Sequence, residues 1–375
     1  MPCLSQASVK TVKAEPCSGP RNHSSLTAAR ESGSISIDRS IDKMSSIRLL
    51  NVLSLPPEDV ARLRAVSPRL DIVELAETEI NAVQDWAAEI VFAHSAPPTS
   101  GTPALRWLQL SSAGVNHLQG SDIWQRQVVV TNARGVYAVP MAEYVMTAVL
   151  SFSNRVEERR ELQVRHQWPT DGVAYECYGV RGRTMVIVGY GTVGRELARL
   201  AKAFGMHVLA IKANPANRSD DSFRIPRTGD PGGKLPDRIV GLEQAADLLR
   251  LADYVVLTLP LTPLTEGFFG RELLAEVRPT AWLINVGRGK VIDEQALIDR
   301  MRHRQIAGAW LDVFGQEPLP PGSPIWELPN VIVTPHLSGG NRESFHVLTD
   351  LLCENLRRYL AGDPLVNPVR PDLGY

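Results

Sequence analysis

The chain has 375 residues, enough for about two domains of ordinary size, and apolar residues make up 44% of it, which is ample for large cores. Its formal net charge of −1 gives no reason to expect binding to nucleic acid or to an anionic membrane, and no run of about 18 apolar residues predicts a membrane-spanning helix. Its four cysteines lack the spacing of a metal site and fit a reducing compartment, so we expect a cytoplasmic protein without bound metal.

The beginning of the chain differs from the rest. Residues 1–46 are rich in Ser, poor in aromatic and β-branched residues, and carry six basic against four acidic side chains, which predicts a disordered tail. The same composition suits an organelle transit peptide, so targeting of that kind is an alternative. An over-long gene model is another, because Met44 would make a natural start just before the first predicted strand.

From residue 47 on, short apolar runs alternate with helical patterns. Helices are predicted from about residue 56, over residues 80–86, and from Pro140 to about residue 167, where the proline suits the first turn. Strands that alternate with helices indicate a parallel sheet covered on both faces. The strands predicted in this half of the chain cover residues 47–53, 71–75, 89–93, 107–110 and 128–132.

A glycine-rich turn follows the apolar run 185–188 and leads into an amphipathic stretch. Gly189 permits a tight turn, Gly191 lets the backbone approach a pyrophosphate, and Gly194 lets the following helix pack close to the strand. The helix N-terminus would supply unpaired N–H groups for the phosphates. A second apolar run, 207–211, completes a βαβ unit, which favours a dinucleotide site over a plain structural turn.

The end of the second strand indicates which dinucleotide is bound. NAD sites usually place Asp or Glu about 20 residues past the glycines, to hold the ribose 2′-hydroxyl. Here that position is Lys212, and no carboxylate occurs before Asp220. Lys212 would attract a 2′-phosphate, and Asn214 and Arg218 could add donors, so we predict that NADPH is preferred and that NADH is possible. The alternative is that Lys212 is an ordinary solvated loop lysine.

The remaining pattern predicts a second set of strands and a final helix. Strands are expected over residues 254–257, 281–285, 308–312 and 331–334. The final helix runs from about residue 342 to 360, ends before Gly362, and is expected to pack back on the first domain. The predicted fold class is therefore α/β, with two doubly wound parallel sheets.

Three polar residues stand at or just past predicted strand ends, where open α/β sheets place their ligands. The Arg288 guanidinium can bind a carboxylate through two parallel hydrogen bonds. Glu317 can fix and stabilise an imidazole, and His336 is of the residue type best suited to proton transfer near neutral pH. Taken singly, they could be a surface arginine, a loop carboxylate and a structural histidine. Together with a nicotinamide site, they supply what the reduction of a 2-keto acid needs.

These motifs resemble the D-isomer-specific 2-hydroxyacid dehydrogenase family, and especially its glyoxylate/hydroxypyruvate reductase branch. The resemblance extends over roughly residues 47–375, and its order and spacing make chance similarity a poor explanation. It identifies the family better than the substrate. The matching segments are residues 188–195, 259–262, 285–289, 311–318 and 334–336.

The resemblance implies roles for the site residues. Arg288 would bind the substrate carboxylate and polarise the keto oxygen, while backbone N–H groups near Ala113 and Gly114 would clamp the same carboxylate. His336 would donate the proton in reduction, with Glu317 holding and tuning it. The substrate would be a small 2-keto acid.

The resemblance also implies cofactor contacts. The backbone amides of Thr192 and Val193 would meet the pyrophosphate, and Asp312 would contact the nicotinamide side. Trp326 matches a pocket-wall position, although a core tryptophan is an alternative. The other positions that the resemblance assigns to the cofactor are Pro260, Thr265 and Val286.

A domain plan follows from the resemblance. It implies a flavodoxin-like substrate domain over residues 47–137, a Rossmann NAD(P)-binding domain over residues 138–336, and a segment over residues 337–375 that returns to the substrate domain. It further implies a homodimer, formed mainly through the helix around residues 140–167.

Two other functions share this pattern. Formate dehydrogenases resemble the chain but carry Gln where it has Glu317, which argues against them. Transcriptional corepressors of the same fold keep the Arg, Glu and His and act as dinucleotide-dependent scaffolds. The chain also departs from the family at Lys212, at Asn116, whose place is often acidic, and after His336.

Overall fold

The structure is a computed structural model, and it describes residues 46–76, 79, 87–98, 101–170 and 177–371. The predicted helix over residues 80–86 and all but the last residue of the predicted tail lie outside these ranges. Among the described residues, no helix combines the length and apolar character needed to cross a bilayer.

The first sheet is parallel throughout and has the strand order β2-β1-β3-β4-β5. Every residue of β3 and β4 is buried, which explains why these strands appear in the sequence as continuous apolar runs rather than alternating ones. The order is that of a flavodoxin-like doubly wound sheet. Its strands are β1 (Ile47–Asn51), β2 (Leu70–Glu74), β3 (Ile90–Ala93), β4 (Trp107–Leu110) and β5 (Val129–Thr131).

The second sheet is also parallel, with the order β12-β11-β10-β9-β6-β7-β8. The order reverses between β6 and β9, and such a switch point is where open α/β sheets bind their ligands. The strands are β6 (Thr184–Val188), β7 (His207–Ile211), β8 (Arg238–Val240), β9 (Tyr254–Leu257), β10 (Trp282–Asn285), β11 (Gly308–Leu311) and β12 (Val331–Val333). Only β8 was not predicted, because its three residues include a single pair of apolar ones, whereas the equally short edge strands β5 and β12 belong to longer apolar runs.

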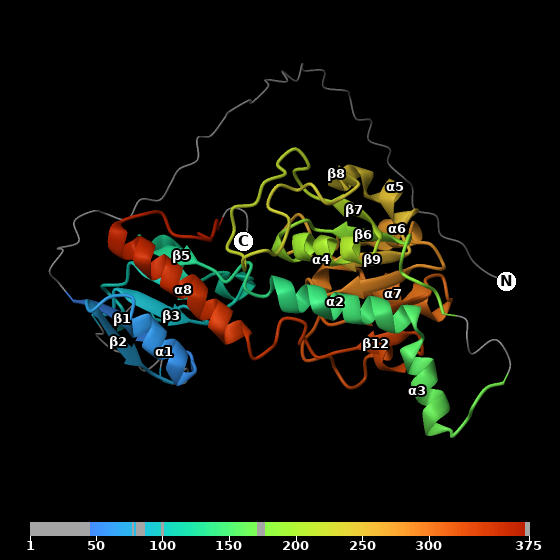
Figure 1. The fold of residues 1–375 in the computed structure, drawn as a ribbon, viewed down its shortest axis with the longest axis horizontal. Coiled ribbons are helices and arrows are strands. Elements are labelled where there is room, and N and C mark those ends of the chain that lie inside the picture. Colours follow the sequence, from blue (N-terminus) through green and yellow to red (C-terminus); the bar gives the residue numbers. More distant parts are fainter. Residues whose placement is uncertain (1–45, 77–78, 80–86, 99–100, 171–176, 372–375) are drawn as a thin grey trace, which may run out of the picture. The chain divides into compact units, whose positions relative to one another are not determined.

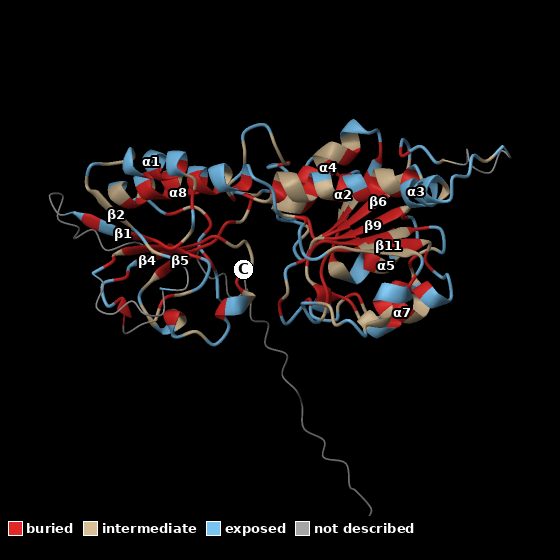
Figure 2. Cartoon of the chain, turned by 90° about the horizontal axis from the view of Figure 1, so that it is seen from below, coloured by how far each residue is buried: buried red, intermediate tan, exposed pale blue. Residues whose placement is uncertain are grey.

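All helices but α3 flank one of the sheets, and the exposed residues of these helices lie on the faces turned away from the strands (Figure 1 and Figure 2). The helices of the described residues are α1 (Pro57–Arg64), α2 (Ala138–Ser153), α3 (Val156–Val164), α4 (Thr192–Ala203), α5 (Ala245–Leu249), α6 (Arg271–Ala275), α7 (Glu294–Arg302) and α8 (Ser344–Ala361). Short 3-10 turns occur at Asn116–Leu118, Asp122–Gln125, Leu242–Gln244, Gly289–Val291 and Pro324–Glu327. The two doubly wound parallel sheets confirm the predicted fold class.

The single long helix predicted from Pro140 to residue 167 is wrong, because the chain forms two helices there. Arg155 adopts a left-handed backbone with φ 51° between α2 and α3, and the amide of Asn154 donates to the Leu150 carbonyl from its own side chain. Asparagine competes with the helix in this way. The two halves also differ in environment, since α2 buries an apolar face against α4 whereas α3 buries no residue.

The final helix packs on the first sheet, as predicted. Leu351 and Leu356 of α8 are fully buried in one core with Ile47 of β1, and the Tyr359 ring stacks on Trp107 of β4 with centroids 5.5 Å apart. Gly362 ends the helix with φ 74°, a left-handed conformation that glycine adopts readily. The chain therefore returns to its starting sheet, while the domain boundaries themselves stay a prediction.

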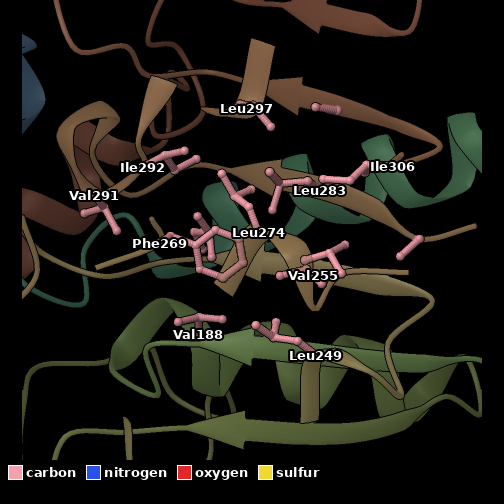
Figure 3. Packing of buried hydrophobic residues seen from close by; sticks show 14 of the residues in the cluster. Val188, Leu249, Val255, Phe269, Leu274, Leu283, Val291, Ile292, Leu297 and Ile306 are labelled. Carbon is pink, nitrogen blue, oxygen red and sulfur yellow. The ribbon is translucent and has the colours of Figure 1, made fainter. Parts of the chain in front are cut away.

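The second sheet has apolar cores on both of its faces. Figure 3 shows one of them, where Val255 and Leu283 of the strands meet Phe269, Leu274 and neighbouring side chains of the covering segments. Burial on both faces keeps the strands rigid, so the loops at their carboxyl ends have fixed starting points.

Truncation of one buried side chain in α8 tests this packing. We expect Leu351→Ala to lower the free energy of unfolding by about 2–5 kcal/mol, because it leaves a cavity in a fully buried site. Leu251→Ala is the control, since Leu251 is 52% exposed and its loss should change stability by less than about 0.5 kcal/mol. Urea denaturation followed by circular dichroism measures both, and equal effects would contradict the packing described for α8.

Candidate active site

The glycine turn after β6 has the geometry that its sequence predicts. Gly189 has φ 105°, a backbone conformation that other residues rarely adopt. A Cβ on Gly194 would lie 2.4 Å from the Gly189 carbonyl oxygen, so only glycine lets α4 approach the strand this closely. A Cβ on Gly191 would meet nothing within 4 Å. The turn therefore leaves open space in front of the first residues of α4, Thr192 and Val193, which are half-buried.

A buried arginine ties this helix to the loop between β7 and β8. Arg195 is 2% exposed, and its guanidinium donates to the carbonyls of Asp230 and Arg218, the latter at 2.8 Å. Its Nε lies 3.5 Å from Asp220 Oδ2, and its charge lies over the Tyr190 ring, 4.9 Å from the centroid. One side chain thus joins the start of α4 to both ends of the loop. Sequence reasoning assigned Arg195 no role.

Lys212 stands at the start of that loop, directly after β7. It is half-buried, and its ammonium donates to the Asn217 carbonyl. Desolvation and then the nearby charge of Arg195 lower the pKa of Lys212, while Asp220 acts in the opposite direction. Arg218 is exposed on the same loop. Lys212 is therefore an ordered residue at the end of the strand, not a freely solvated one.

Asp312, directly after β11, organises the turn that carries His336. Its carboxylate is fully buried and accepts hydrogen bonds from the Thr334 hydroxyl at 2.7 Å and from the backbone N–H groups of Leu337 and Ser338, both at 2.9 Å. The N–H of His336 donates to the Asp312 carbonyl at 2.9 Å. These bonds hold His336 in a left-handed backbone with φ 54°, which is strained for a residue with a Cβ.

His336 and Glu317 form a hydrogen-bonded pair. Nδ1 of His336 lies 2.7 Å from Oε2 of Glu317, and Oε1 of Glu317 accepts from the Phe314 N–H at 2.9 Å. A carboxylate accepts hydrogen bonds, so this contact assigns the proton of the neutral ring to Nδ1 and leaves Nε2 as the other nitrogen. About half of the imidazole is exposed.

Arg288 lies beside this pair and beside the loop after β4. Its Nη1 donates to the Gly287 carbonyl at 2.7 Å, and a Cβ added to Gly114 would overlap its Nη2 at 2.0 Å. Burial lowers the pKa of Arg288, and the Glu317 carboxylate opposes that shift. The structure therefore brings together Arg288, Glu317 and Gly114, although the first and last of them are 174 positions apart in the sequence.

The loop around Ala113 and Gly114 is braced by side chains. The Ser112 hydroxyl donates to the Gly114 carbonyl at 2.8 Å, and the Asn132 amide donates to the Ala113 carbonyl at 2.9 Å. The Asn116 amide donates to the carbonyl of Leu261, which belongs to the loop after β9, at 2.8 Å. These contacts fix the loop from both sides.

The other predicted residues surround the same loops. The Thr265 hydroxyl donates to the Pro260 carbonyl at 2.6 Å and so closes the loop after β9, whereas Val286 is 1% exposed at the end of β10. Trp326 is 52% exposed and donates its indole N–H to the Pro320 carbonyl at 2.9 Å. It is therefore not a core tryptophan.

Comparison with known proteins identifies the family. The family model described as D-isomer specific 2-hydroxyacid dehydrogenase, NAD binding domain, matches residues 146–338. A glyoxylate reductase of Korarchaeum cryptofilum is 34% identical over 72% of this chain and 78% of that protein, and a glyoxylate/hydroxypyruvate reductase B of Yersinia enterocolitica is 32% identical over 72% and 79%.

A solved structure agrees with these matches. A D-isomer specific 2-hydroxyacid dehydrogenase from Xanthobacter autotrophicus Py2, in complex with NADPH and MES, covers 88% of this chain and 100% of its own, with 29% identity and a TM-score of 0.73. The glycine turn, the sheet order and these matches lead to one conclusion. The chain belongs to the D-isomer specific 2-hydroxyacid dehydrogenase family and is an oxidoreductase with that family's NAD-binding domain.

Proposed function

We propose that this chain reduces small 2-keto acids, such as glyoxylate and hydroxypyruvate, to 2-hydroxy acids with NADPH as the preferred reductant. The observation that carries the proposal is the 2.7 Å contact between His336 and Glu317 beside Arg288. A proton donor and a carboxylate anchor at one place are what this reaction requires. The relatives named glyoxylate reductase and glyoxylate/hydroxypyruvate reductase support the choice of substrates.

Arg288 is proposed to bind the substrate carboxylate through two parallel hydrogen bonds and to polarise the keto oxygen. Its partial burial favours this role, because a desolvated guanidinium gains more from an anionic ligand than a solvated one does. Backbone N–H groups at Ala113 and Gly114 would complete the clamp, with their carbonyls already engaged by Asn132 and Ser112. Trp326 would form part of the pocket wall.

His336 is proposed to act as the general acid. The hydrogen bond from Nδ1 to Glu317 fixes the ring, so that Nε2 can face the substrate and give its proton to the developing alkoxide. The Glu317 carboxylate stabilises the protonated imidazole before this transfer. In the oxidative direction the same nitrogen would accept the proton. The reduced nicotinamide, when bound, supplies the hydride.

The residues of the second sheet are proposed to hold the dinucleotide. The amides of Thr192 and Val193, at the start of α4, would bind the pyrophosphate in front of Gly191. Lys212 would bind the 2′-phosphate of the adenosine ribose, with Asn214 and Arg218 as further donors. The nicotinamide side would be lined by Pro260, Thr265, Val286 and Asp312.

The preference for NADPH rests on charge. A carboxylate at the end of β7 would repel a 2′-phosphate, and Lys212 occupies that position instead. The relative from Xanthobacter autotrophicus, whose structure contains NADPH, is in line with this assignment. NADH is a possible but weaker substrate.

The two competing functions gain no support. Formate dehydrogenases carry Gln in place of Glu317, and here a carboxylate meets the histidine. A corepressor-like scaffold would act without catalysing a reaction, whereas the relatives reported above are named as enzymes.

We also propose a homodimer that acts in the cytoplasm. Support comes from α3 and the segment after it, which expose Val164 to 65% and Trp168 to 87%, an apolar surface that a second copy would cover. Light scattering of the purified chain measures the assembly, and a monomeric mass at micromolar concentration would contradict it.

Replacement of the proposed acid is the central test. His336→Asn should lower kcat for glyoxylate by about 10²–10⁴-fold, because the proton donor is lost, and asparagine tolerates the left-handed backbone at this position. Glu317→Gln should lower kcat to a smaller extent, since an amide cannot stabilise a protonated ring. Steady-state oxidation of NADPH measures both. His303→Asn is the control, and near-normal turnover of the His336 variant would refute the proposed role.

The cofactor preference has its own test. Lys212→Asp should reduce kcat/KM for NADPH by roughly 10–100-fold, the value of one charged hydrogen bond, and should spare or improve kcat/KM for NADH. Lys234→Asp, an exposed change in the same loop, should leave the ratio of the two constants unaltered. A wild-type chain that strongly prefers NADH would contradict the assignment of Lys212 to the 2′-phosphate.

Alanine substitutions at two glycines distinguish an effect on cofactor binding from an effect on folding. Gly191→Ala should weaken NADPH binding while the thermal unfolding midpoint changes little, because its Cβ would enter open space in front of α4. Gly194→Ala should cost about 1–3 kcal/mol of stability, since its Cβ would overlap the Gly189 carbonyl. Fluorescence titration and differential scanning calorimetry measure the two effects. Unchanged NADPH affinity in the Gly191 variant would contradict the proposed pyrophosphate site.

A further inference from the structure

Two histidines stack against each other at the carboxyl end of the first sheet. His94 follows β3, and His117 belongs to the loop after β4, the neighbouring strand. Their ring centroids are 4.9 Å apart and their planes differ by 12°. His117 Nε2 donates to the His94 carbonyl at 2.8 Å, and His94 Nδ1 lies 3.3 Å from the Ser111 hydroxyl. In each ring one nitrogen thus bonds to the protein. The other nitrogen, Nδ1 of His117 or Nε2 of His94, is available to a ligand.

The pair stands next to the proposed carboxylate clamp. Only three positions separate His117 from Gly114, which contacts Arg288. Partial desolvation, and then the neighbouring His94 and Arg288, lower the pKa of His117, whereas its hydrogen bond to the His94 carbonyl opposes the shift. The charge of Arg288 therefore acts on His117, and the loop that carries Gly114 lies against the Arg288 guanidinium.

The stacked histidines differ from two other histidines of the chain in their partners. His336 has Glu317 as its partner and His346 has Asp59, but in the described part of the chain neither His94 nor His117 forms an ion pair with a carboxylate. Both rings are exposed. The two rings and the Arg288 guanidinium offer hydrogen-bond donors to an anion, and the one carboxylate described beside them, that of Glu317, is already bonded to His336.

We propose that His94 and His117 form a second substrate subsite, which binds a carboxylate at the far end of a 2-keto acid. Arg288 and the loop at Gly114 would hold the first carboxylate. Nε2 of His94 would donate to the second, and Nδ1 of His117 would do so once that ring takes up a proton. The preferred substrates would then be 2-keto acids with two carboxylates rather than aliphatic ones of the same size. This inference rests on the proposed function, because it names the substrate class of the same site.

A simpler reading is that the stack only braces its loop. Phenylalanine distinguishes the two, because it preserves a flat ring of similar size but has no nitrogen. If the rings only brace the loop, His94→Phe and His117→Phe should affect all substrates alike. If the nitrogens bind substrate, the loss should be confined to substrates with a second carboxylate.

The test uses two keto acids of nearly equal shape, oxaloacetate and 4-methyl-2-oxopentanoate, with glyoxylate as the reference. In the wild-type chain, kcat/KM should favour oxaloacetate by roughly tenfold or more, and His117→Phe should lower that value about 10–100-fold, the loss expected for a hydrogen bond to a charged group. Turnover of glyoxylate should stay within about twofold of wild type, since it has no far end. His303→Phe, an exposed change, is the matched control.

Each outcome decides between the possibilities. A wild-type enzyme that reduces glyoxylate but does not favour oxaloacetate overturns the subsite and leaves the proposed function intact. Equal losses for all three substrates in both variants also overturn it. No turnover of any keto acid with either cofactor refutes the proposed function and the subsite together. If a phenylalanine variant does not fold by circular dichroism, His117→Gln or His94→Asn replaces it, because each retains only the nitrogen that bonds to the protein, and the same selective loss is expected.

Discussion

The buried carboxylate of Asp312 is the interaction on which the candidate site depends. It follows a strand whose position is set by the sheet, and its oxygens accept from the Thr334 hydroxyl and from two backbone N–H groups of the next strand's exit. A buried carboxylate is tolerable only with such partners. Because the loop is anchored there, His336 has a defined direction, and Glu317 has a fixed ring to bind. Without the Asp312 carboxylate, the turn that carries His336 would lose three hydrogen bonds.

A similar role belongs to Arg195 at the other end of the second sheet. Its guanidinium fastens the loop after β7 to the helix that follows the glycine turn. The proposed pyrophosphate and 2′-phosphate positions are thereby parts of one rigid unit, so that binding at one end needs little reordering at the other. In both places a buried charged side chain fixes the backbone of the loop around it.

The sequence was a good guide wherever a pattern is local. Eleven of the described strands, the glycine turn and the final helix have apolar runs or breakers that sequence reasoning can use. Arg288, Glu317 and His336 were singled out because they follow strand ends, and their roles stay a prediction. The break at Arg155 and the edge strand β8 were missed, since one depends on a single left-handed residue and the other has only two apolar residues in a row. The contacts of Asp312, Arg195 and the stacked histidines join residues distant in sequence, and no periodicity encodes them.

The left-handed backbone at His336 strains the fold at the residue that is proposed to donate the proton. Glycine would adopt that conformation without strain and so relieve the fold, but it has no imidazole. Selection for stability alone would therefore favour glycine at this position, whereas selection for the proposed proton transfer would retain the histidine. A stabilised form of the chain obtained by screening for heat resistance is thus at risk of being an inactive one.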